Sequence, residues 1–401
     1  MNRFPKPDFE SGYVYPQQQF VIPNEVLWSY IDIAVLVFLM GFVTWALIKK
    51  QIRWPVVLTS VVSIFYFGFF RNGCVCGIGA VQNVVLTLVS DSYSIPLYLL
   101  LLFTLPLVFA IFFGRVFCAG VCPFGALQEL VNVKNWKISK SVSTVLGVFP
   151  WVYLGFAVLF AVTNSRFIIC RFDPFVWIFR FGGELPLILF GVLLLIFSVF
   201  TGRPFCRFIC PYGAILSLFS KISFRQVKIT KKECINCSLC HNACPVDAIY
   251  PPYQNKVNEI RSKGVHRILR YVVFMPLMVA AGVTIMYMLS DKISRVNNDV
   301  RLYDMAMGNE TNHSNVLSLE LEAFWGREQT LEELAVRVEE VQKGFRIWSI
   351  IIGAFFGLVI ALKLIHLSTK RGRKVYDISS AECVGCGRCF SYCPQNQKKI
   401  S

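Results

Sequence analysis

Long apolar runs separated by short polar loops dominate this chain of 401 residues. Seven runs approach or reach the roughly 17–25 residues that a helix needs to cross a bilayer. They predict spans at about 27–48, 54–70, 95–114, 142–162, 185–201, 268–289 and 347–366. The mean hydropathy of +0.55 and the 16% of charged residues, against about a quarter in soluble domains, agree with this pattern. The expected fold class is therefore an all-α polytopic membrane protein with about seven transmembrane helices.

Basic residues gather in the loops beside some of these runs. Lysine and arginine follow the first, third, fifth and seventh runs, whereas 291–346 is rich in glutamate. Because cytoplasmic loops carry the excess of lysine and arginine, we expect the N-terminus outside and the C-terminus in the cytoplasm. Arg166, Arg171 and Arg180 lie against this bias in a predicted outer loop. The net charge of +16 thus belongs to membrane-flanking loops, and we expect no nucleic-acid partner.

Two copies of one cysteine motif lie on either side of the last two runs. Each has the form Cys-x2-Cys-x2-Cys-x3-Cys-Pro, which is the ferredoxin run whose first three thiolates hold one iron–sulfur cluster and whose fourth holds another. A pair of zinc sites, or one degenerate copy, is the weaker alternative, because zinc sites rarely use so compact a run. We expect two 4Fe-4S clusters, one on Cys234, Cys237, Cys240 and Cys393, and one on Cys383, Cys386, Cys389 and Cys244.

Shared ligation of this kind requires the two motifs to meet on one side of the membrane. We therefore expect a small α+β ferredoxin module assembled from two distant segments, 228–264 and 369–401. Residues 1–25 lack the apolar core of a cleaved signal peptide. The other expected divisions are an outer segment 1–26, a five-span domain 27–227, a span in 265–290, an outer acidic loop 291–346 and a span in 347–368.

The five-span region contains an internal repeat. The pattern Phe-Cys-x3-Cys-Pro-aromatic-Gly-Ala occurs at 117–126 and again at 205–214, each time after an apolar run and a Gly-Arg pair. Cysteines four residues apart share a helix face, and the following proline can open the next helix. Parallel repeats commonly pack around a pseudo-two-fold axis. This packing would gather Cys118, Cys122, Cys206 and Cys210 as ligands of a further cluster or metal; the alternative is ordinary buried cysteine.

Three more cysteines, Cys74, Cys76 and Cys170, fall on the predicted outer side. They could ligate another redox centre there, or Cys170 could form a disulfide with one of the other two. His266 and His366 lie near the inner ends of the last two spans. Juxtamembrane histidines are more often interface residues, so we do not expect haem. Segment 318–343 alternates acidic and apolar residues at helical spacing, which predicts either a solvated amphipathic helix or a docking surface.

The paired Cys-x3-Cys-Pro motifs and the ferredoxin runs resemble those of the membrane-bound polyferredoxin family, over about residues 54–250 and 380–394. That family includes membrane ferredoxin subunits of periplasmic nitrate reductase systems and the membrane protein that supports nitrous oxide reductase. The resemblance implies a bacterial inner-membrane protein that passes electrons between the quinol pool or a cytoplasmic donor and a periplasmic acceptor. In several members the two runs lie close together, whereas a membrane hairpin separates them here. We see no flavin-attachment motif.

We therefore expect a membrane electron-transfer protein, which is typically a subunit of an oxidoreductase complex. Its expected partners are membrane lipid, redox subunits on one or both sides, and a quinone as a further candidate. No residue set is typical of a hydrolase or transferase. The alternatives are a membrane reductase that keeps copper reduced for the assembly of another enzyme, a redox sensor, and a structural scaffold. The direction of electron flow is left open by the sequence.

Overall fold

The computed structural model describes residues 26–73, 77–90, 93–229, 234–252, 261–308, 321, 324–325, 330–368 and 375–400. Most of them are helical. Within these described ranges, four helices are long and apolar enough to cross a bilayer, namely Leu27–Lys50, Lys140–Val162, Ile268–Ser294 and Leu331–Ser368. Each of the seven predicted spans is helical, and the number that cross the membrane stays a prediction. The predicted segment 1–25 and most of 309–329 lie outside the described residues.

The first copy of the repeat begins after the N-terminal helix, which is α-helical and then π-helical. Several of its helices start with a proline in the first turn, where the missing N–H costs nothing. The N-terminal helix consists of α1 (Val26–Thr44) and η1 (Trp45–Lys50). The first copy consists of α2 (Trp54–Ser63), η2 (Ile64–Phe70), α3 (Gly77–Val89), α4 (Leu97–Phe113), η3 (Phe117–Val121) and α5 (Pro123–Val131).

The second copy follows the same order with shorter pieces on the predicted outer side. Its elements are α6 (Lys140–Leu146), α7 (Phe149–Val162), α8 (Ile168–Arg171), α9 (Pro174–Phe179), α10 (Leu185–Phe200), α11 (Pro204–Phe208) and α12 (Pro211–Ser220). The helices α5 and α12 start at Pro123 and Pro211, as the sequence predicted.

The two copies pack against each other through exchanged aromatic contacts. Phe117 of the first copy meets Tyr212 of the second, with ring centroids 6.0 Å apart. The equivalent pair is Phe205 of the second copy and Phe124 of the first, at 6.4 Å. Reciprocal contacts between equivalent residues are what a two-fold arrangement produces. The two copies therefore make reciprocal contacts of the kind that the predicted pseudo-two-fold packing requires.

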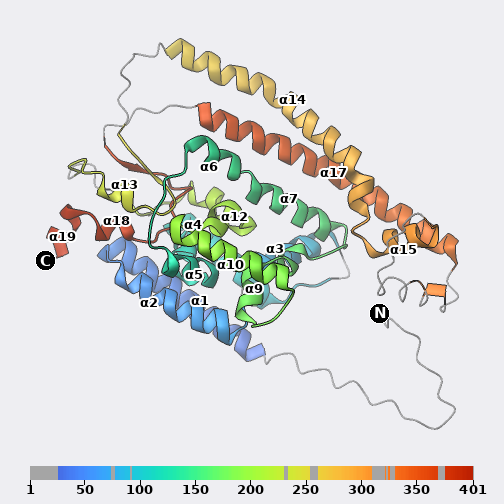
Figure 1. The fold of residues 1–401 in the computed structure, drawn as a ribbon, viewed down its shortest axis with the longest axis horizontal. Coiled ribbons are helices and arrows are strands. Elements are labelled where there is room, and N and C mark those ends of the chain that lie inside the picture. Colours follow the sequence, from blue (N-terminus) through green and yellow to red (C-terminus); the bar gives the residue numbers. More distant parts are fainter. Residues whose placement is uncertain are drawn as a thin grey trace, which may run out of the picture.

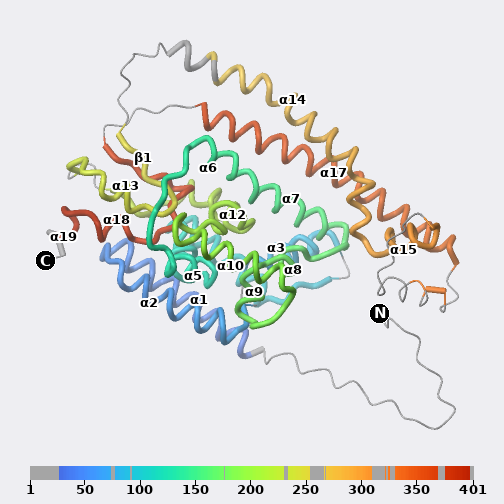
Figure 2. The backbone as a smooth tube through the Cα atoms, in the orientation of Figure 1, coloured from blue at the N-terminus to red at the C-terminus, as the bar shows by residue number. Residues whose placement is uncertain are grey.

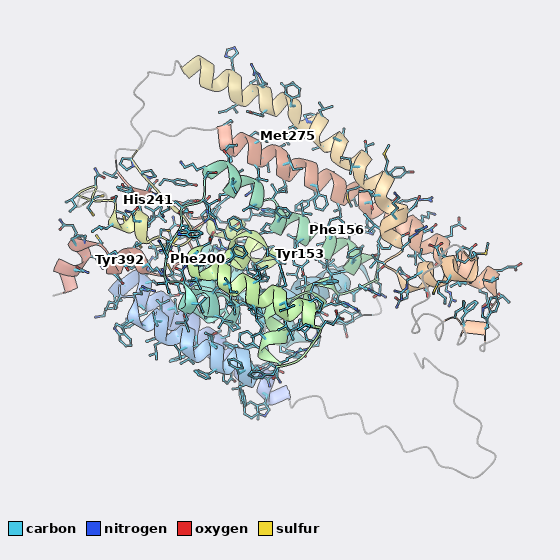
Figure 3. All side chains as sticks on the ribbon, viewed as in Figure 1. Tyr153, Phe156, Phe200, His241, Met275 and Tyr392 are labelled. Atoms are coloured by element: carbon cyan, nitrogen blue, oxygen red, sulfur yellow. The ribbon has the colours of Figure 1, made fainter. Side chains whose placement is uncertain are left out.

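A long antiparallel hairpin covers one side of this body (Figure 1). Helix α14 (Arg261–Ser294) has 34 residues and α17 (Leu331–Ser368) has 38. At 1.5 Å per residue they extend for about 51 and 57 Å, well beyond the ~30 Å of a bilayer core. Helix α17 packs on α7, for example through Phe356 on Phe156, whereas the membrane-length part of α14 is almost wholly exposed. Figure 3 labels Phe156 on α7, and Met275 on α14.

Glycines let the two helices of the hairpin approach closely. A Cβ added to Gly353 of α17 would lie 2.5 Å from the Gly282 oxygen of α14, whereas one added to Gly344 of α17 would meet no atom within 4 Å. We expect Gly353→Ala to lower the thermal unfolding midpoint of the purified protein, because overpacking costs about 1–3 kcal/mol. Gly344→Ala is the matched control and should keep or raise the midpoint, because alanine favours helix. Equal midpoints would contradict this account of the hairpin.

The far end of the hairpin carries a small separate core. Helix α15 (Asn298–Ala306) contributes Val300, and α17 contributes Leu334 and Val338, which pack with Phe324. Part of the predicted outer loop 291–346 is therefore helical. The apolar side chains at Leu334 and Val338 are buried inside the chain. Of the two alternatives for 318–343, the docking surface therefore cannot include Leu334 and Val338, because these side chains are already covered inside the chain.

The ferredoxin segments gather at the opposite end of the molecule (Figure 1). Their elements are α13 (Leu239–Ala243), β1 (Ile249–Tyr250), β2 (Asp377–Ile378), α18 (Arg388–Ser391) and α19 (Pro394–Ile400). The two strands pair antiparallel, with Ile249 opposite Ile378 and Tyr250 opposite Asp377. The strand after α13 and the C-terminal strand meet in the trace of Figure 2. Segments separated by the whole hairpin therefore share one small sheet.

Candidate iron–sulfur sites

One cysteine-lined cavity opens at the surface of the ferredoxin end. The residues Cys234, Cys237, Cys240 and Cys393 line it, and so does Cys389. Cys237 is exposed. Three of these five thiols belong to the first run, and Cys389 and Cys393 are the last two cysteines of the second run. We call this the outer ferredoxin cavity, where outer means nearer to the surface of the module and does not refer to a side of the membrane.

A second cavity lies beside it, and we call it the inner ferredoxin cavity. The thiols of Cys383, Cys386 and Cys389 line it together with Cys244, the last cysteine of the first run. Cys389 borders both cavities. Each lining thus combines cysteines of both runs and contains one of the two crossed sets, with Cys389 shared between the cavities. The assignment of the ligands stays a prediction.

Backbone pairing holds these two sets together. Besides the two-residue sheet, the Ser379 N–H donates to the Ala248 oxygen at 2.9 Å. The Tyr250 hydroxyl donates to a carboxylate oxygen of Glu382 at 2.7 Å. The Nδ1 of His241 lies 2.6 Å from the Ile249 oxygen, and Figure 3 labels His241 within this module. His241 therefore supports the fold around the first run.

Burial favours the neutral form of three thiols in this module, those of Cys240, Cys383 and Cys386. Desolvation raises the pKa of Cys240 and of Cys383 to about 11, and that of Cys386 to about 12. Because thiolates, not thiols, are the metal ligands, binding of a metal releases the thiol protons. The positive charge of the metal then stabilises the buried thiolates. In the described part of the chain, no three His, Cys, Asp or Glu side chains converge as the ligands of a single metal ion do. Five thiols line one cavity of the module and four line the other, with Cys389 in both, which gives each cavity enough cysteines for the four-cysteine ligation of an iron–sulfur cluster.

The repeat forms a third cavity inside the helical body, which we call the membrane-domain cavity. Arg115, Gly213 and apolar side chains complete its walls. The four thiols on its lining come from equivalent positions in the two copies, Cys118, Cys122, Cys206 and Cys210.

The local geometry of these thiols differs from the expected one. Cysteines four residues apart were expected on one helix face, but Cys122 and Cys210 both have extended backbone and act as the residue before a new helix. The cause is the following proline, which disfavours helical backbone at the preceding residue. The Sγ of Cys210 accepts the Gly213 N–H at 3.2 Å. This is the position where a helix N-terminus favours negative charge.

Two arginines cross between the copies near this cavity. A Cβ on Gly125 of the first copy would lie 3.5 Å from Nη1 of Arg203, and one on Gly213 of the second would lie 3.3 Å from Nη2 of Arg115. These are the arginines of the two Gly-Arg pairs seen in the sequence. Arg203 is wholly buried. Each arginine thus lies against the equivalent glycine of the other copy, so the two glycine–arginine contacts are reciprocal.

A buried carboxylate connects this region to the second ferredoxin run. Glu129 of α5 pairs with Arg203 at 3.1 Å, with Arg388 at 2.6 Å and with Arg53 at 3.2 Å. Arg388 lies between Cys386 and Cys389 in the sequence. We call these four residues, Glu129, Arg53, Arg203 and Arg388, the Glu129 cluster.

The other hydrogen bonds of Arg203 reach the membrane-domain cavity. Its guanidinium donates to the carbonyl oxygens of Cys118 and Ala119. Arg115 donates to the Ala381 oxygen at 3.1 Å, two residues before Cys383. Both arginines therefore link the cysteine motifs of the helical body to the second ferredoxin run.

Further contacts fix the first run to the helical body. Asp247 pairs with Lys137 and with Arg207, each at 2.9 Å. Gly202 packs so closely on Pro245 that a Cβ at this position would collide with the proline ring and its carbonyl group. The ferredoxin module is thus held against the body by ion pairs and by close packing.

The sequence did not single out Glu129, Arg388 or Gln128. The Gln128 side chain donates to the Sγ of Cys206 at 3.5 Å and accepts the Phe205 N–H at 3.1 Å, so it spans the two copies. The sequence did contain a signal at Glu129, which is a lone acidic residue shortly after the apolar cysteine motif at 117–126. Because a buried charge requires a partner, this residue could have been predicted to form an ion pair.

Among the remaining predicted residues, Cys170, His266 and His366 do not line these cavities. Cys74 and Cys76 lie outside the described residues. Cys170 is exposed, and its Sγ would lie 2.9 Å from a Cβ on Gly79. His266 and His366 are exposed on α14 and α17.

Comparison with known proteins agrees with this arrangement. Two families described as 4Fe-4S binding domains match, one at residues 95–141 and 184–232 and the other at 227–250 and 376–398. The first covers both Cys-x3-Cys-Pro motifs, and the second covers both ferredoxin runs. No solved structure was found to match the chain.

Three curated relatives show the range of similarity. The chain is 28% identical over 198 residues to the uncharacterized protein MJ0750 of Methanocaldococcus jannaschii, covering 47% of this chain and 80% of that one. It is 27% identical over 225 residues to the regulatory protein NosR of Stutzerimonas stutzeri, covering 52% of this chain and 31% of that one. It is 28% identical over 167 residues to the ferredoxin-type protein NapH of Haemophilus influenzae, covering 38% and 55%.

Cysteine-lined cavities at the end of a body of apolar helices define the class of protein, which is a helical iron–sulfur protein of the ferredoxin type. Within that class, the chain is similar to membrane-associated 4Fe-4S ferredoxin-type proteins.

Proposed function

We propose that this protein transfers electrons across part of the inner membrane, between the cytoplasmic side or the quinol pool and a partner on the outer side. The observation that carries the proposal is the succession of three thiol-lined cavities. The first two share Cys389. The Glu129 cluster and Arg115 bridge the second and third. A route for electrons requires redox centres placed in such a series.

The proposed topology has seven spans, with the N-terminus outside and the ferredoxin module in the cytoplasm. Basic loops beside the inner ends of the helices support this orientation. Helix α15 belongs to the predicted outer loop 291–346, and the ferredoxin module lies at the opposite end of the molecule, which also supports this orientation (Figure 1). The two-segment assembly of the module is supported by the pairing of β1 with β2.

Each proposed ligand set consists of four cysteines. The outer ferredoxin cavity would use Cys234, Cys237, Cys240 and Cys393, and the inner one would use Cys383, Cys386, Cys389 and Cys244. The membrane-domain cavity would use Cys118, Cys122, Cys206 and Cys210. An iron–sulfur cluster bound at such a set supplies one-electron chemistry.

The other residues of the chain hold and insulate these sets. Phe117, Phe124, Phe205 and Tyr212 keep water from the membrane-domain cavity. The Glu129 cluster brings positive charge to the boundary between two cavities that would each gain negative charge on ligation. Opposite charges at short range stabilise one another most strongly where water is excluded.

Iron and sulfide analysis of the purified protein tests the proposal. Three clusters would give about 12 iron and 12 sulfide per chain. The variant Cys206→Ala should lose about four of each and keep the electron paramagnetic resonance (EPR) signals of the two ferredoxin clusters. About eight iron atoms in both proteins would confine redox chemistry to the ferredoxin module. Wild-type protein with no sulfide would overturn the proposed function.

A further inference from the structure

The outer ferredoxin cavity reaches the surface of the protein. Cys237 at its mouth is exposed. Large apolar side chains near it are also exposed, with Ile235 at 59%, Leu239 at 44% and Tyr392 at 53%. Figure 3 labels Tyr392 at this end of the molecule. An exposed apolar rim around a thiol-lined opening is unusual on a free surface, so it indicates a contact surface.

The charge around this opening is positive. Lys228 and Gln51 line the cavity, and Lys49 and Lys50 directly precede Gln51. All three lysines are exposed. The described segments that meet here are 45–54, 225–229, 234–240 and 388–400, and none of them contains an acidic residue. In the sequence between 225 and 240, the one acidic residue is Glu233. A partner with acidic side chains around its own redox centre would be complementary to this rim.

We propose that this rim, formed by Lys49, Lys228, Ile235, Leu239 and Tyr392, is the docking surface for a small acidic one-electron carrier protein. The inference rests on the proposed function and names the chemistry of the soluble partner. In each encounter the reduced carrier loses one electron and this chain gains one. Charge complementarity speeds such encounters, and redox partners commonly meet over small, transient interfaces.

Anionic lipid headgroups also attract lysine, but the placement of the rim favours a protein. The cavity lies in the module at the end of the long axis of the helices (Figure 1). Lipid would surround the sides of those helices. Lys228 belongs to the ferredoxin segment itself, and it lines the cavity together with the thiols.

Anaerobic stopped-flow mixing of the full-length protein in neutral-lipid nanodiscs with a reduced acidic ferredoxin tests the proposal. The second-order rate constant should fall at least about tenfold from low to high salt, because salt screens steering charges. The double variant Lys49→Glu/Lys228→Glu should lower it about tenfold at low salt. The matched control is Lys221→Glu, an exposed lysine at the end of α12 that does not line the cavity, and it should react like the wild type.

Reduction by dithionite distinguishes a failure of the proposed electron-transfer function from a failure of the docking surface alone. If dithionite fails to bleach the visible absorbance of the wild-type protein, the proposed function fails. If dithionite reduces every variant equally but the acidic ferredoxin shows no dependence on salt or on the double variant, the docking surface alone is overturned. Loss of binding to anionic liposomes in the double variant, with unchanged ferredoxin kinetics, would also overturn it and assign the lysines to lipid.

Discussion

Replacing Glu129 with glutamine is expected to destabilise the junction between the helical body and the ferredoxin module. Burial opposes ionisation of this carboxyl group, but Arg203, Arg388 and Arg53 hold its pKa below the usual value. The carboxylate is therefore charged at neutral pH, and the amide would leave buried guanidinium groups uncompensated. Removing one partner of a buried ion pair costs about 3–5 kcal/mol. We expect a lower unfolding midpoint and loss of iron from the second ferredoxin run.

The pH dependence follows from the sign of the pKa shift. A carboxyl group with a lowered folded-state pKa contributes stability above its unfolded pKa and loses it as the pH falls through the folded value. The difference in unfolding midpoint between wild type and Glu129→Gln should therefore be full at neutral pH and shrink in acid. A constant difference across this range would show that the amide acts through its shape and not its charge.

A matched substitution controls for the chemical change itself. Glu184 is 65% exposed in its side chain and lies 3.9 Å from Arg171. Exposed pairs of this kind contribute about 0–1 kcal/mol, so Glu184→Gln should leave the midpoint nearly unchanged. Equal effects of the two substitutions would contradict a special role for the Glu129 cluster.

Sequence patterns predicted much of this architecture because they repeat. The apolar runs identify the helices, and the match between 117–126 and 205–214 predicts two halves facing each other. The exchanged contacts of Phe117 and Phe205 have this form. The spacing of the cysteines likewise predicts crossed ligand sets, because it is imposed by a cluster chemistry that is known in advance.

The Glu129 cluster was harder to predict because its members lie far apart along the chain. Arg53, Glu129, Arg203 and Arg388 meet only after the repeat and the hairpin have folded. No local periodicity marks such a meeting. The helical face expected for each Cys-x3-Cys pair was also wrong, because the effect of proline on the preceding residue outweighed helical spacing.

The crossed ligand sets predict which cysteine variants share a phenotype. Cys393→Ala in the second run should remove the same EPR signal as Cys237→Ala in the first run, because both thiols line the outer ferredoxin cavity. Cys244→Ala should instead match Cys386→Ala, because both line the inner one. Each variant should lose about four iron atoms, which is one 4Fe-4S cluster.

The four variants distinguish a shared module from two independent ones. If each run folded around its own cluster, Cys244→Ala would match Cys237→Ala, and Cys393→Ala would match Cys386→Ala. The structure opposes that outcome, because Cys244 lies against the second run, and Cys393 against the first. The Glu129 cluster adds a further distinction. Since Arg388 belongs to the run that lines the inner cavity, Glu129→Gln should reproduce the spectrum of Cys244→Ala and Cys386→Ala rather than that of Cys237→Ala and Cys393→Ala.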